Sequence, residues 1–360
     1  MSRTDNVGVR ERALRDSLSL SSETGFLVTG LNDIRWLSGF TGSNGCISLS
    51  QNGIQLFTDS RYTEQAARQC PGLEVRTVAG NVSKHGISAL EKSGVSRCLF
   101  QPEQLTAGKL ISHQRAFPQM EFEGSDPFPC LRAVKDGSEI QKMRFALKIT
   151  EQVFEEMKSF LRPGVSEREV ASQIDYRQRC LGADASSFET IVAFGSNSSL
   201  PHATPGPAVL EHGQPILIDF GCICDGYMSD MTRTMHLGEP SSEFVRAYSA
   251  VQGALQAVSE QATSGVTGND LDAIARLHLQ TDGYEDYFLH SLGHGVGLDI
   301  HEWPTLSKRG ETLLPEDCVV TFEPGVYIAD EFGIRIENMA ILRENTAQII
   351  NTYTTDLVIL

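Results

Sequence analysis

The chain has 360 residues, a formal net charge of −16 and an apolar fraction of 40%. This length usually exceeds a single hydrophobic core, and the composition excludes intrinsic disorder, a collagen-like repeat and a disulfide scaffold. The negative charge disfavours nucleic acid and anionic membrane surfaces as partners, because both require a basic protein face.

The N-terminus carries charged residues as far as Arg15 and shows no apolar run of signal-peptide length. Nowhere do 18 apolar residues occur together, so no membrane span is predicted. The eight cysteines include no Cys-x-x-Cys pair, which favours reduced thiols over a zinc ribbon. Together these features predict a cytoplasmic protein.

The first 130 residues alternate short apolar runs with turn signals, a pattern typical of strands. Strands are predicted at residues 24–30, 45–50 and 53–58, and a helix at residues 60–70. The segment 124–129 contains two prolines and a glycine, which indicates a loop and a domain boundary near it.

From Ser138 onward an apolar stripe at helical spacing predicts a long helix, which Ser138 caps and Pro163 ends. Two further helices are predicted at about residues 242–262 and 269–280, the second capped by Asn269 or Asp270. Three apolar strands that end in acidic residues are predicted at 215–219, 318–323 and 333–337. The second part of the chain therefore mixes helix and sheet.

The acidic excess lies entirely in this second part. Residues 1–135 hold 15 basic and 13 acidic side chains, whereas residues 136–360 hold 15 and 33, a balance of −18. Either these carboxylates form a well-solvated surface, which is the commoner reason for such a bias, or some of them bind a polyvalent cation. Composition alone does not choose between the two.

Residue types at the predicted strand ends indicate a metal site. The candidate ligands are four carboxylates and one imidazole: Asp219, Asp230, His294, Glu323 and Glu337. This set suits a pair of divalent ions bridged by carboxylates better than a single zinc ion, which usually takes more nitrogen or sulfur ligands. For any one of these residues alone, a helix cap, a surface charge or a structural histidine is the commoner role.

Five ordered motifs in the second part resemble the proline-specific metallopeptidases of the pita-bread fold, namely the Xaa-Pro aminopeptidases and Xaa-Pro dipeptidases (prolidases). They occupy residues 187–202, 218–234, 290–302, 322–327 and 335–338. Residues 36–44 and 56–62 resemble the creatinase-type N-terminal domain of the same family, and are most similar to the aminopeptidases. The resemblance covers nearly the whole chain.

The resemblance implies an α/β (α+β) fold with two domains. Residues 1–133 would form a creatinase-like domain with a mixed sheet, and residues 134–360 a pita-bread catalytic domain. It also implies that the five candidate ligands hold two divalent ions, commonly manganese and sometimes cobalt or zinc. In that arrangement Asp230 and Glu337 bridge the ions, Asp219 completes one, and His294 and Glu323 complete the other.

The resemblance assigns roles to further residues. His202 and His301 match positions that hydrogen-bond the substrate and the tetrahedral intermediate, and Glu323 matches a ligand that also shuttles a proton. His290 matches a position near the proline-binding pocket, with packing as a nearly equal alternative. Arg335 matches an arginine that positions ligands or substrate, and a salt bridge to a ligand carboxylate is an equally good interpretation; Tyr327 and Asp299 are weaker candidates.

The leading hypothesis is an Xaa-Pro aminopeptidase, in which a metal-bridging hydroxide attacks the bond between an N-terminal residue and a following proline. The alternatives are a dipeptidase restricted to Xaa-Pro dipeptides and a non-catalytic binding protein on the same scaffold. The expected partners are a peptide with proline at its second position and a second copy of the chain in a homodimer, with no nucleic acid and no membrane.

Overall fold

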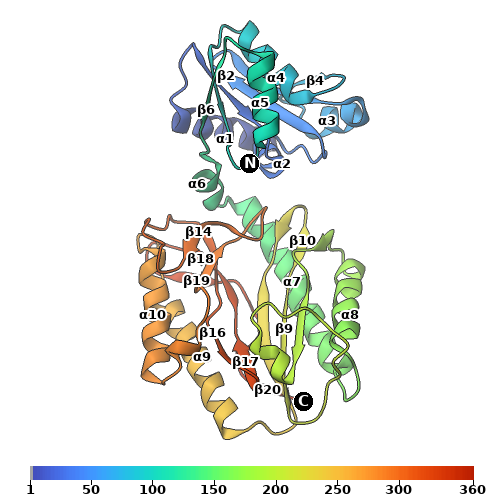
Figure 1. The fold of residues 1–360 in the computed structure, drawn as a ribbon, viewed down its shortest axis with the longest axis vertical. Helices are drawn as coiled ribbons and strands as arrows, with labels where there is room; N and C mark the ends of the chain where they lie inside the picture. The colour runs from blue at the N-terminus through green and yellow to red at the C-terminus, as the bar shows by residue number, and fades with distance from the viewer. Residues whose placement is uncertain (1–2) are drawn as a thin grey trace. The chain divides into compact units, whose positions relative to one another are not determined.

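The computed structural model describes residues 3–360, with side chains described from residue 7 onward. Packing divides the chain into two compact units, Met1–Arg132 and Ala133–Leu360, each of which is described by itself (Figure 1). Both units combine helices with sheets, which confirms the predicted α/β class. Within the described residues no helix is both long and apolar enough to cross a membrane.

The first unit is built on a mixed six-stranded sheet in the order β4-β3-β2-β1-β5-β6. Its strands are β1 (Thr24–Val28), β2 (Gly45–Ser50), β3 (Gly53–Thr58), β4 (Glu74–Thr77), β5 (Arg97–Phe100) and β6 (Glu121–Gly124). Its helices are α1 (Arg3–Leu18), α2 (Leu31–Ser38), η1 (Ser60–Tyr62), α3 (Thr63–Gln69), α4 (Val82–Lys92) and α5 (Ala107–Ala116), and α6 (Phe128–Ala133) lies at the boundary. Strand β1 is buried along its whole length, which explains its continuous apolar sequence.

The second unit contains two larger sheets, with the orders β20-β12-β9-β8 and β14-β13-β15-β18-β19, and two smaller ones, β11-β10-β7 and β16-β17. Its first strands are β7 (Ala185–Ser186), β8 (Ile191–Phe194), β9 (Gln214–Phe220), β10 (Cys222–Cys224), β11 (Tyr227–Met228) and β12 (Met231–Leu237). Its later strands are β13 (Gly293–Gly295), β14 (Glu302–Leu306), β15 (Val319–Phe322), β16 (Gly325–Ile328), β17 (Phe332–Arg335), β18 (Asn338–Leu342), β19 (Ala347–Ile349) and β20 (Val358–Ile359).

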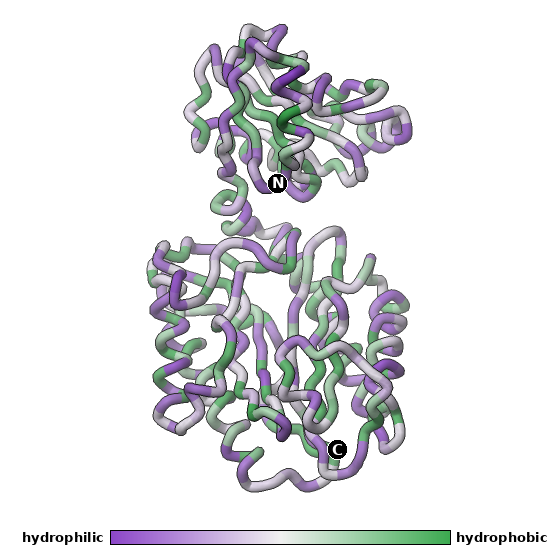
Figure 2. The backbone as a smooth tube through the Cα atoms, viewed as in Figure 1, coloured by the Kyte–Doolittle hydropathy of each residue, from purple (hydrophilic) through white to green (hydrophobic). Residues whose placement is uncertain are grey.

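Helices flank these strands on opposite sides of the unit. They are α7 (Gly137–Phe160), α8 (Glu167–Cys180), α9 (Ser242–Gln261) and α10 (Gly268–Thr281), with short turns η2 (Gly195–Ser199) and η3 (Glu285–Tyr287). Helices α7 and α8 pack beside β8 and β10, and α9 and α10 beside β14, β15 and β17 (Figure 1). Figure 2 shows hydrophilic and hydrophobic residues mixed along the outer helices, as expected when one face of each helix is buried and the other is exposed.

The helix starts differ from the predicted ones in a consistent way. Helix α7 is capped by Asp136 instead of Ser138, because the Asp136 carboxylate accepts the N–H groups of Ser138 and Glu139 while Glu139 reaches back to the Asp136 N–H. Helix α10 starts one residue earlier than predicted and uses the same capping box with Thr267 as cap. In a capping box the acidic residue lies three positions after the cap. The residues predicted as caps therefore lie within the first turn of their helices.

Strand positions follow the apolar runs closely. Strands β2 and β3 span the predicted residues, and β9 and β15 agree to within two residues at each end. Strand β17 ends at Arg335, so Glu337 lies beyond the strand in the segment that leads to β18. The predicted strand at 333–337 was therefore too long, because Glu337 N–H donates to Thr232 of another strand instead of continuing the β16–β17 ladder.

Candidate metal centre

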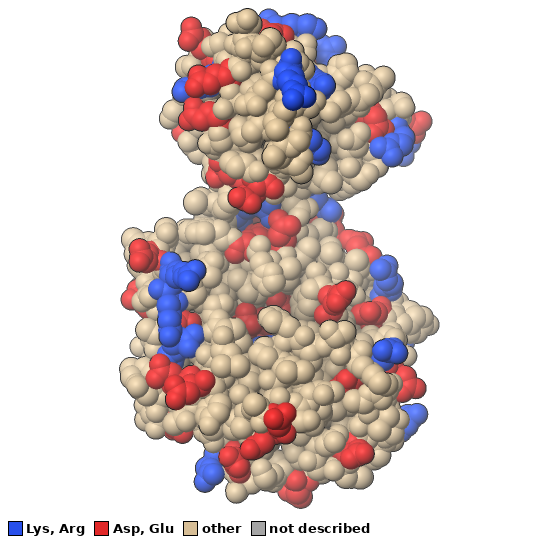
Figure 3. Space-filling view, viewed as in Figure 1, with Lys and Arg blue, Asp and Glu red and all other residues tan. Residues whose placement is uncertain are grey.

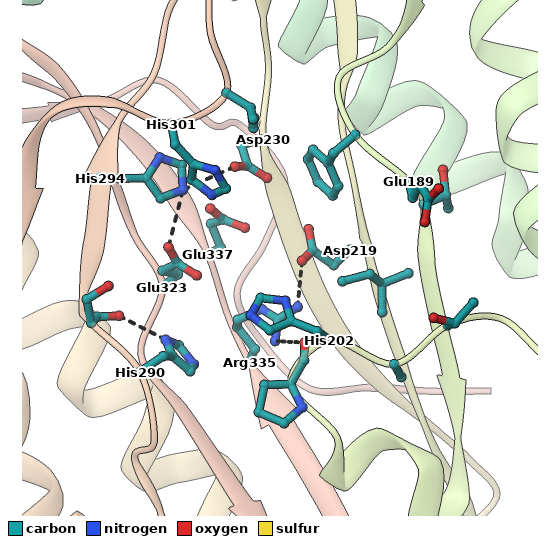
Figure 4. Close-up of a pocket in the computed structure, with 18 of the residues that line it drawn as sticks. Glu189, His202, Asp219, Asp230, His290, His294, His301, Glu323, Arg335 and Glu337 are labelled. Carbon is teal, nitrogen blue, oxygen red and sulfur yellow. Dashed lines mark hydrogen bonds and ion pairs between the residues drawn. The ribbon is translucent and has the colours of Figure 1, made fainter. Parts of the chain in front are cut away.

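The second unit contains a cavity of about 720 Å³ between its two larger sheets. The acidic and histidine side chains that line this cavity gather in one region, the candidate metal centre (Figure 4). Nine of the eleven site residues predicted from the sequence line it, and the weaker candidates Tyr327 and Asp299 do not. The nine are His202, Asp219, Asp230, His290, His294, His301, Glu323, Arg335 and Glu337. Segments more than 100 residues apart in the chain supply these side chains.

The β9–β12 pair places two of the carboxylates. In this antiparallel ladder Asp219, near the end of β9, is opposite Thr232 of β12, and Asp230 immediately precedes β12. The end of one antiparallel strand meets the start of the next, so both carboxylates lie at the same end of the ladder. Both strands are almost wholly buried, which holds these side chains in a rigid frame.

The five-stranded sheet places the other three ligand candidates by the same geometry. Phe322 of β15 is opposite Asn338 of β18, so Glu323, just after β15, and Glu337, just before β18, lie at one end of that ladder. His294 is in the middle of β13, the neighbour of β15. The side chains of His294, Glu323 and Glu337 point into one space, which Asp230 also faces (Figure 4).

The polar atoms of this centre are close enough to share cations. The His294 Nε2 atom lies 3.6 Å from Asp230 Oδ2 and 3.5 Å from Glu323 Oε1. One ligand atom from each of Asp230, His294 and Glu337 fits within a mutual distance of 4.8 Å. The Asp219 carboxylate lies beside Arg335 and faces the same space (Figure 4).

Two further observations indicate that the centre is built for a metal. Asp219 Oδ1 and Glu337 Oε1 are buried and have no hydrogen-bond partner, a costly state for a carboxylate unless a cation binds it. The Nδ1 atom of His294 lies 3.0 Å from the Gly295 carbonyl, which fixes the proton on Nδ1 and leaves the Nε2 lone pair directed at the carboxylates. Oxygen-rich ligands with one imidazole suit a hard or borderline divalent ion.

The pKa shifts of the centre also support a role in binding a cation. Burial, followed by the charge of Glu337, raises the pKa of Asp230 and of Glu323 well above the usual range. Burial and the nearby Asp219 raise the pKa of Glu337 to about 8. Burial lowers the pKa of His294 to about 4, so this imidazole stays neutral and able to bind a metal. Without a cation, burial and mutual repulsion favour the protonated forms of Asp230, Glu323 and Glu337.

Arg335 connects the centre to the far wall of the cavity. Its guanidinium donates to Asp219 Oδ2 at 2.5 Å, to the Tyr327 hydroxyl at 2.6 Å, to Thr232 Oγ1 at 3.0 Å and to the Pro201 carbonyl at 3.2 Å. The Tyr327 hydroxyl lies 2.9 Å from His290 Nε2. Arg335 therefore holds a ligand carboxylate, and His290 belongs to the same hydrogen-bonded chain.

His202 and His301 are exposed side chains on loops at the edge of the cavity. The ring of His301 lies 4.4 Å from that of His294, in an edge-to-face arrangement. His202 lies near Asp219 and Arg335 (Figure 4). Both imidazoles therefore face the space in front of the centre, where a substrate would lie.

Sequence reasoning missed the hydroxyl groups that orient the ligands. Thr232 Oγ1 donates to Glu337 Oε2 at 2.8 Å, and Thr321 Oγ1 accepts the His294 N–H at 3.1 Å and lies 3.4 Å from Glu323 Oε1. Tyr327 was only a weaker candidate, and Asp299 is absent from the cavity lining. A threonine on a buried strand carries no sequence signal for such a role, because its partner is known only once the sheets are assembled.

Comparison with known proteins identifies two matching families. The pattern described as "Metallopeptidase family M24" matches residues 141–344, and that described as "Creatinase/Prolidase N-terminal domain" matches residues 10–134. Among sequences, the "Uncharacterized peptidase YqhT" of Bacillus subtilis is 37% identical over 337 residues, covering 93% of this chain and 96% of the relative.

Two solved structures are similar along nearly the whole chain. The Xaa-Pro dipeptidase from Bacillus anthracis shares 36% identity with a TM-score of 0.94 and full coverage of both chains. The X-Pro aminopeptidase from Thermotoga maritima shares 36% identity with a TM-score of 0.89, covering 96% of this chain and all of that structure. The two relatives carry different activity names on the same fold.

Proposed function

The chain belongs to metallopeptidase family M24, with a creatinase/prolidase N-terminal domain, and from this we propose that it is an Xaa-Pro aminopeptidase that uses two divalent metal ions. The observation that supports the metal centre most strongly is the convergence of four carboxylates and one neutral imidazole on one cavity, with two buried carboxylate oxygens that lack a partner. Asp219, Asp230, His294, Glu323 and Glu337 are the proposed ligands. Residues 134–360 would form the catalytic domain and residues 1–133 the creatinase-like domain.

Two bound divalent ions would acidify a shared water near neutral pH and polarise the scissile carbonyl. Manganese is the metal we propose, with cobalt or zinc as alternatives. Asp230 and Glu337 would help to hold the ions, because burial raises the pKa of both carboxyl groups and a bound cation would keep them ionised. Arg335 keeps Asp219 in its ligand orientation through the 2.5 Å hydrogen bond.

Side chains at the open side of the centre would transfer the proton and stabilise the developing oxyanion. The side chain of Glu323 is 17% exposed, against 6% for Asp230, so Glu323 is the ligand that can carry a proton to the leaving proline nitrogen. His202 and His301 donate hydrogen bonds to the carbonyl oxygen as negative charge develops on it.

The charges of the cavity favour an aminopeptidase over a dipeptidase. Among the described residues that line it, Arg335 is the one lysine or arginine. The donors of Arg335 are already directed at Asp219, Tyr327, Thr232 and Pro201. A dipeptidase needs a cation for the free carboxylate of its substrate, and the described lining offers no lysine or arginine whose donors are directed at the open cavity.

Paired substrates test this proposal. The manganese-loaded protein should hydrolyse Xaa-Pro-Yaa with a kcat/KM at least about tenfold above that for Xaa-Pro, because only the dipeptide places a free carboxylate on the proline itself, where the lining provides no lysine or arginine to bind it. Xaa-Ala-Yaa serves as the control for proline specificity. Turnover of the dipeptide alone would refute the aminopeptidase assignment and favour the activity named for the Bacillus anthracis structure.

A further inference from the structure

Glu302 is a buried glutamate on the turn that follows the ligand strand β13, and neither the metal centre nor the proposed chemistry uses it. It is the first residue of β14 and directly follows His301. Its side chain is 6% exposed and its Oε1 atom accepts two backbone N–H groups, from Leu298 at 2.8 Å and from Asp299 at 3.0 Å. One carboxylate oxygen therefore closes the turn 296–301.

The other oxygen of Glu302 is held by a buried cation. Lys135 Nζ lies 3.1 Å from Glu302 Oε2, and the Lys135 side chain is 1% exposed. Lys135 is anchored in turn by its backbone N–H, which donates to the Asp317 carbonyl. Salt screens a buried ion pair of this kind poorly, and loss of either partner leaves the other charge buried and unpaired. The ion pair therefore holds the Glu302 carboxylate in one position.

The turn leaves little room for movement around this carboxylate. A methyl group added at Gly297 would lie 2.7 Å from Glu302 Oε2, so the backbone of Gly297 lies directly against the carboxylate. The Gly297 carbonyl also accepts the Met228 N–H at 2.8 Å, which ties the turn to the segment just before Asp230. His301, at the end of the turn, has an exposed side chain and needs such support to keep one orientation.

We infer that Glu302, neutralised by Lys135, is a positioning residue that fixes the turn 296–301 and through it the imidazole of His301. Both of its oxygens face protein donors, so its role is to orient a neighbour and not to touch the substrate. The part of this inference that concerns catalysis rests on the proposed function of His301. The part that concerns the turn rests only on the contacts of Glu302.

A matched control exists on the opposite side of the cavity. Glu167 is likewise buried, and its carboxylate accepts the N–H groups of Phe194 and Gly206 and the side-chain amide of Asn197. These bonds close the segment 194–206, which carries His202. Glu302 thus supports the turn before His301, and Glu167 supports the segment that carries His202. Substitution of one glutamate therefore controls for the non-specific effects of substituting the other.

Hydrogen–deuterium exchange of the full chain tests the structural part without any need for turnover. In Glu302→Gln and in Lys135→Met, peptides that cover residues 296–301 should exchange at least about tenfold faster, since the turn loses its acceptor or the charge that holds it. Lys135→Arg should restore most of the protection. Glu167→Gln should affect residues 194–206 and leave 296–301 unchanged; equal protection of 296–301 in all variants would overturn the inference.

Kinetic double-mutant cycles test the catalytic part, with metal content confirmed equal to that of the unmodified protein. Glu302→Gln should lower kcat about tenfold or more and change KM less than about twofold, as expected when only a transition-state contact is lost. In a His301→Ala background the same change should have less than about a twofold effect, and in a His202→Ala background its full effect.

The inference fails if Glu302→Gln reduces kcat by the same factor in both histidine backgrounds, or if it raises KM alone. A protein that hydrolyses no Xaa-Pro-Yaa peptide at all contradicts the proposed function instead. In that case the exchange experiment still decides whether Glu302 fixes the turn.

Discussion

His290 shows how the cavity keeps an imidazole neutral. Burial, followed by the positive charge of Arg335, lowers the pKa of His290 to about 3. Its Nδ1 atom lies 2.8 Å from the Ser291 carbonyl, so Nδ1 carries the proton and Nε2 accepts from the Tyr327 hydroxyl. A neutral, rigidly held ring of this type presents an apolar face to its neighbours.

This burial predicts a pH dependence of stability. The unfolded chain protonates His290 near pH 6.5 and the folded chain only near pH 3, so the free energy of unfolding falls as the pH drops below 6.5. His290→Asn removes this contribution. Melting curves at pH 7 and pH 4.5 should therefore show a smaller acid-induced loss in the variant than in the unmodified protein.

His212→Asn is the control for this measurement, because its side chain is exposed. It should leave the acid-induced loss unchanged. An equal loss for His290→Asn and the unmodified protein would contradict the buried neutral state of His290.

The candidate ligands were predictable at the residue level because their chemistry is unusual for their positions. Carboxylates directly after apolar strands, with one histidine between glycines, already indicate a site for divalent ions. Glu302 and Thr232 gave no such indication. A glutamate beside a histidine is usually a surface charge, and only the assembled fold reveals that Lys135 and two turn amides lie against it.

At the level of elements, most of the predicted strands and helices are present, and several strands have closely the predicted limits. Strands β2, β3, β9 and β15 are short apolar runs between turn residues, and such runs define their own limits. Helix α8 was not predicted, because its sequence is strongly polar and only a narrow face is buried, including Val170 and Ile174. The two-sheet arrangement that assembles the cavity depends on pairings between distant strands, which local patterns do not specify.

Strand β13 supports a prediction about close packing beside a ligand. A Cβ atom on Gly293 would lie 2.0 Å from the Thr321 carbonyl oxygen of β15, so Gly293→Ala must push the two strands apart. We expect a loss of about 1–3 kcal/mol in the free energy of unfolding, as for other overpacked sites. Because His294 is the next residue, manganese affinity should also fall.

Gly137→Ala provides the matched control, since a Cβ at this first position of α7 meets nothing within 4 Å. Thermal unfolding and manganese titration of both variants check the prediction. A Gly293→Ala protein with unchanged stability and metal affinity would show that β13 and β15 are not packed as described.

For the molecule as a whole, the net charge of −16 comes from the second part of the chain, whose acidic residues fall into two groups. The balance of −18 in residues 136–360 includes the four ligand carboxylates, whose charge two divalent ions would offset. Figure 3 shows the other acidic side chains scattered over the viewed face of the second unit, which is typical of a solvated surface. Both interpretations of the acidic excess therefore have candidate residues, namely the four carboxylates of the cavity and those of the surface.

The central claim is that catalysis depends on two divalent ions held in this cavity. Its most direct test is elemental analysis of the purified protein, with Xaa-Pro-Yaa hydrolysis measured before and after chelation and after addition of Mn²⁺. We expect about two ions per chain, loss of turnover on chelation and its recovery with Mn²⁺. Metal-free protein that still hydrolyses the peptide would contradict the account.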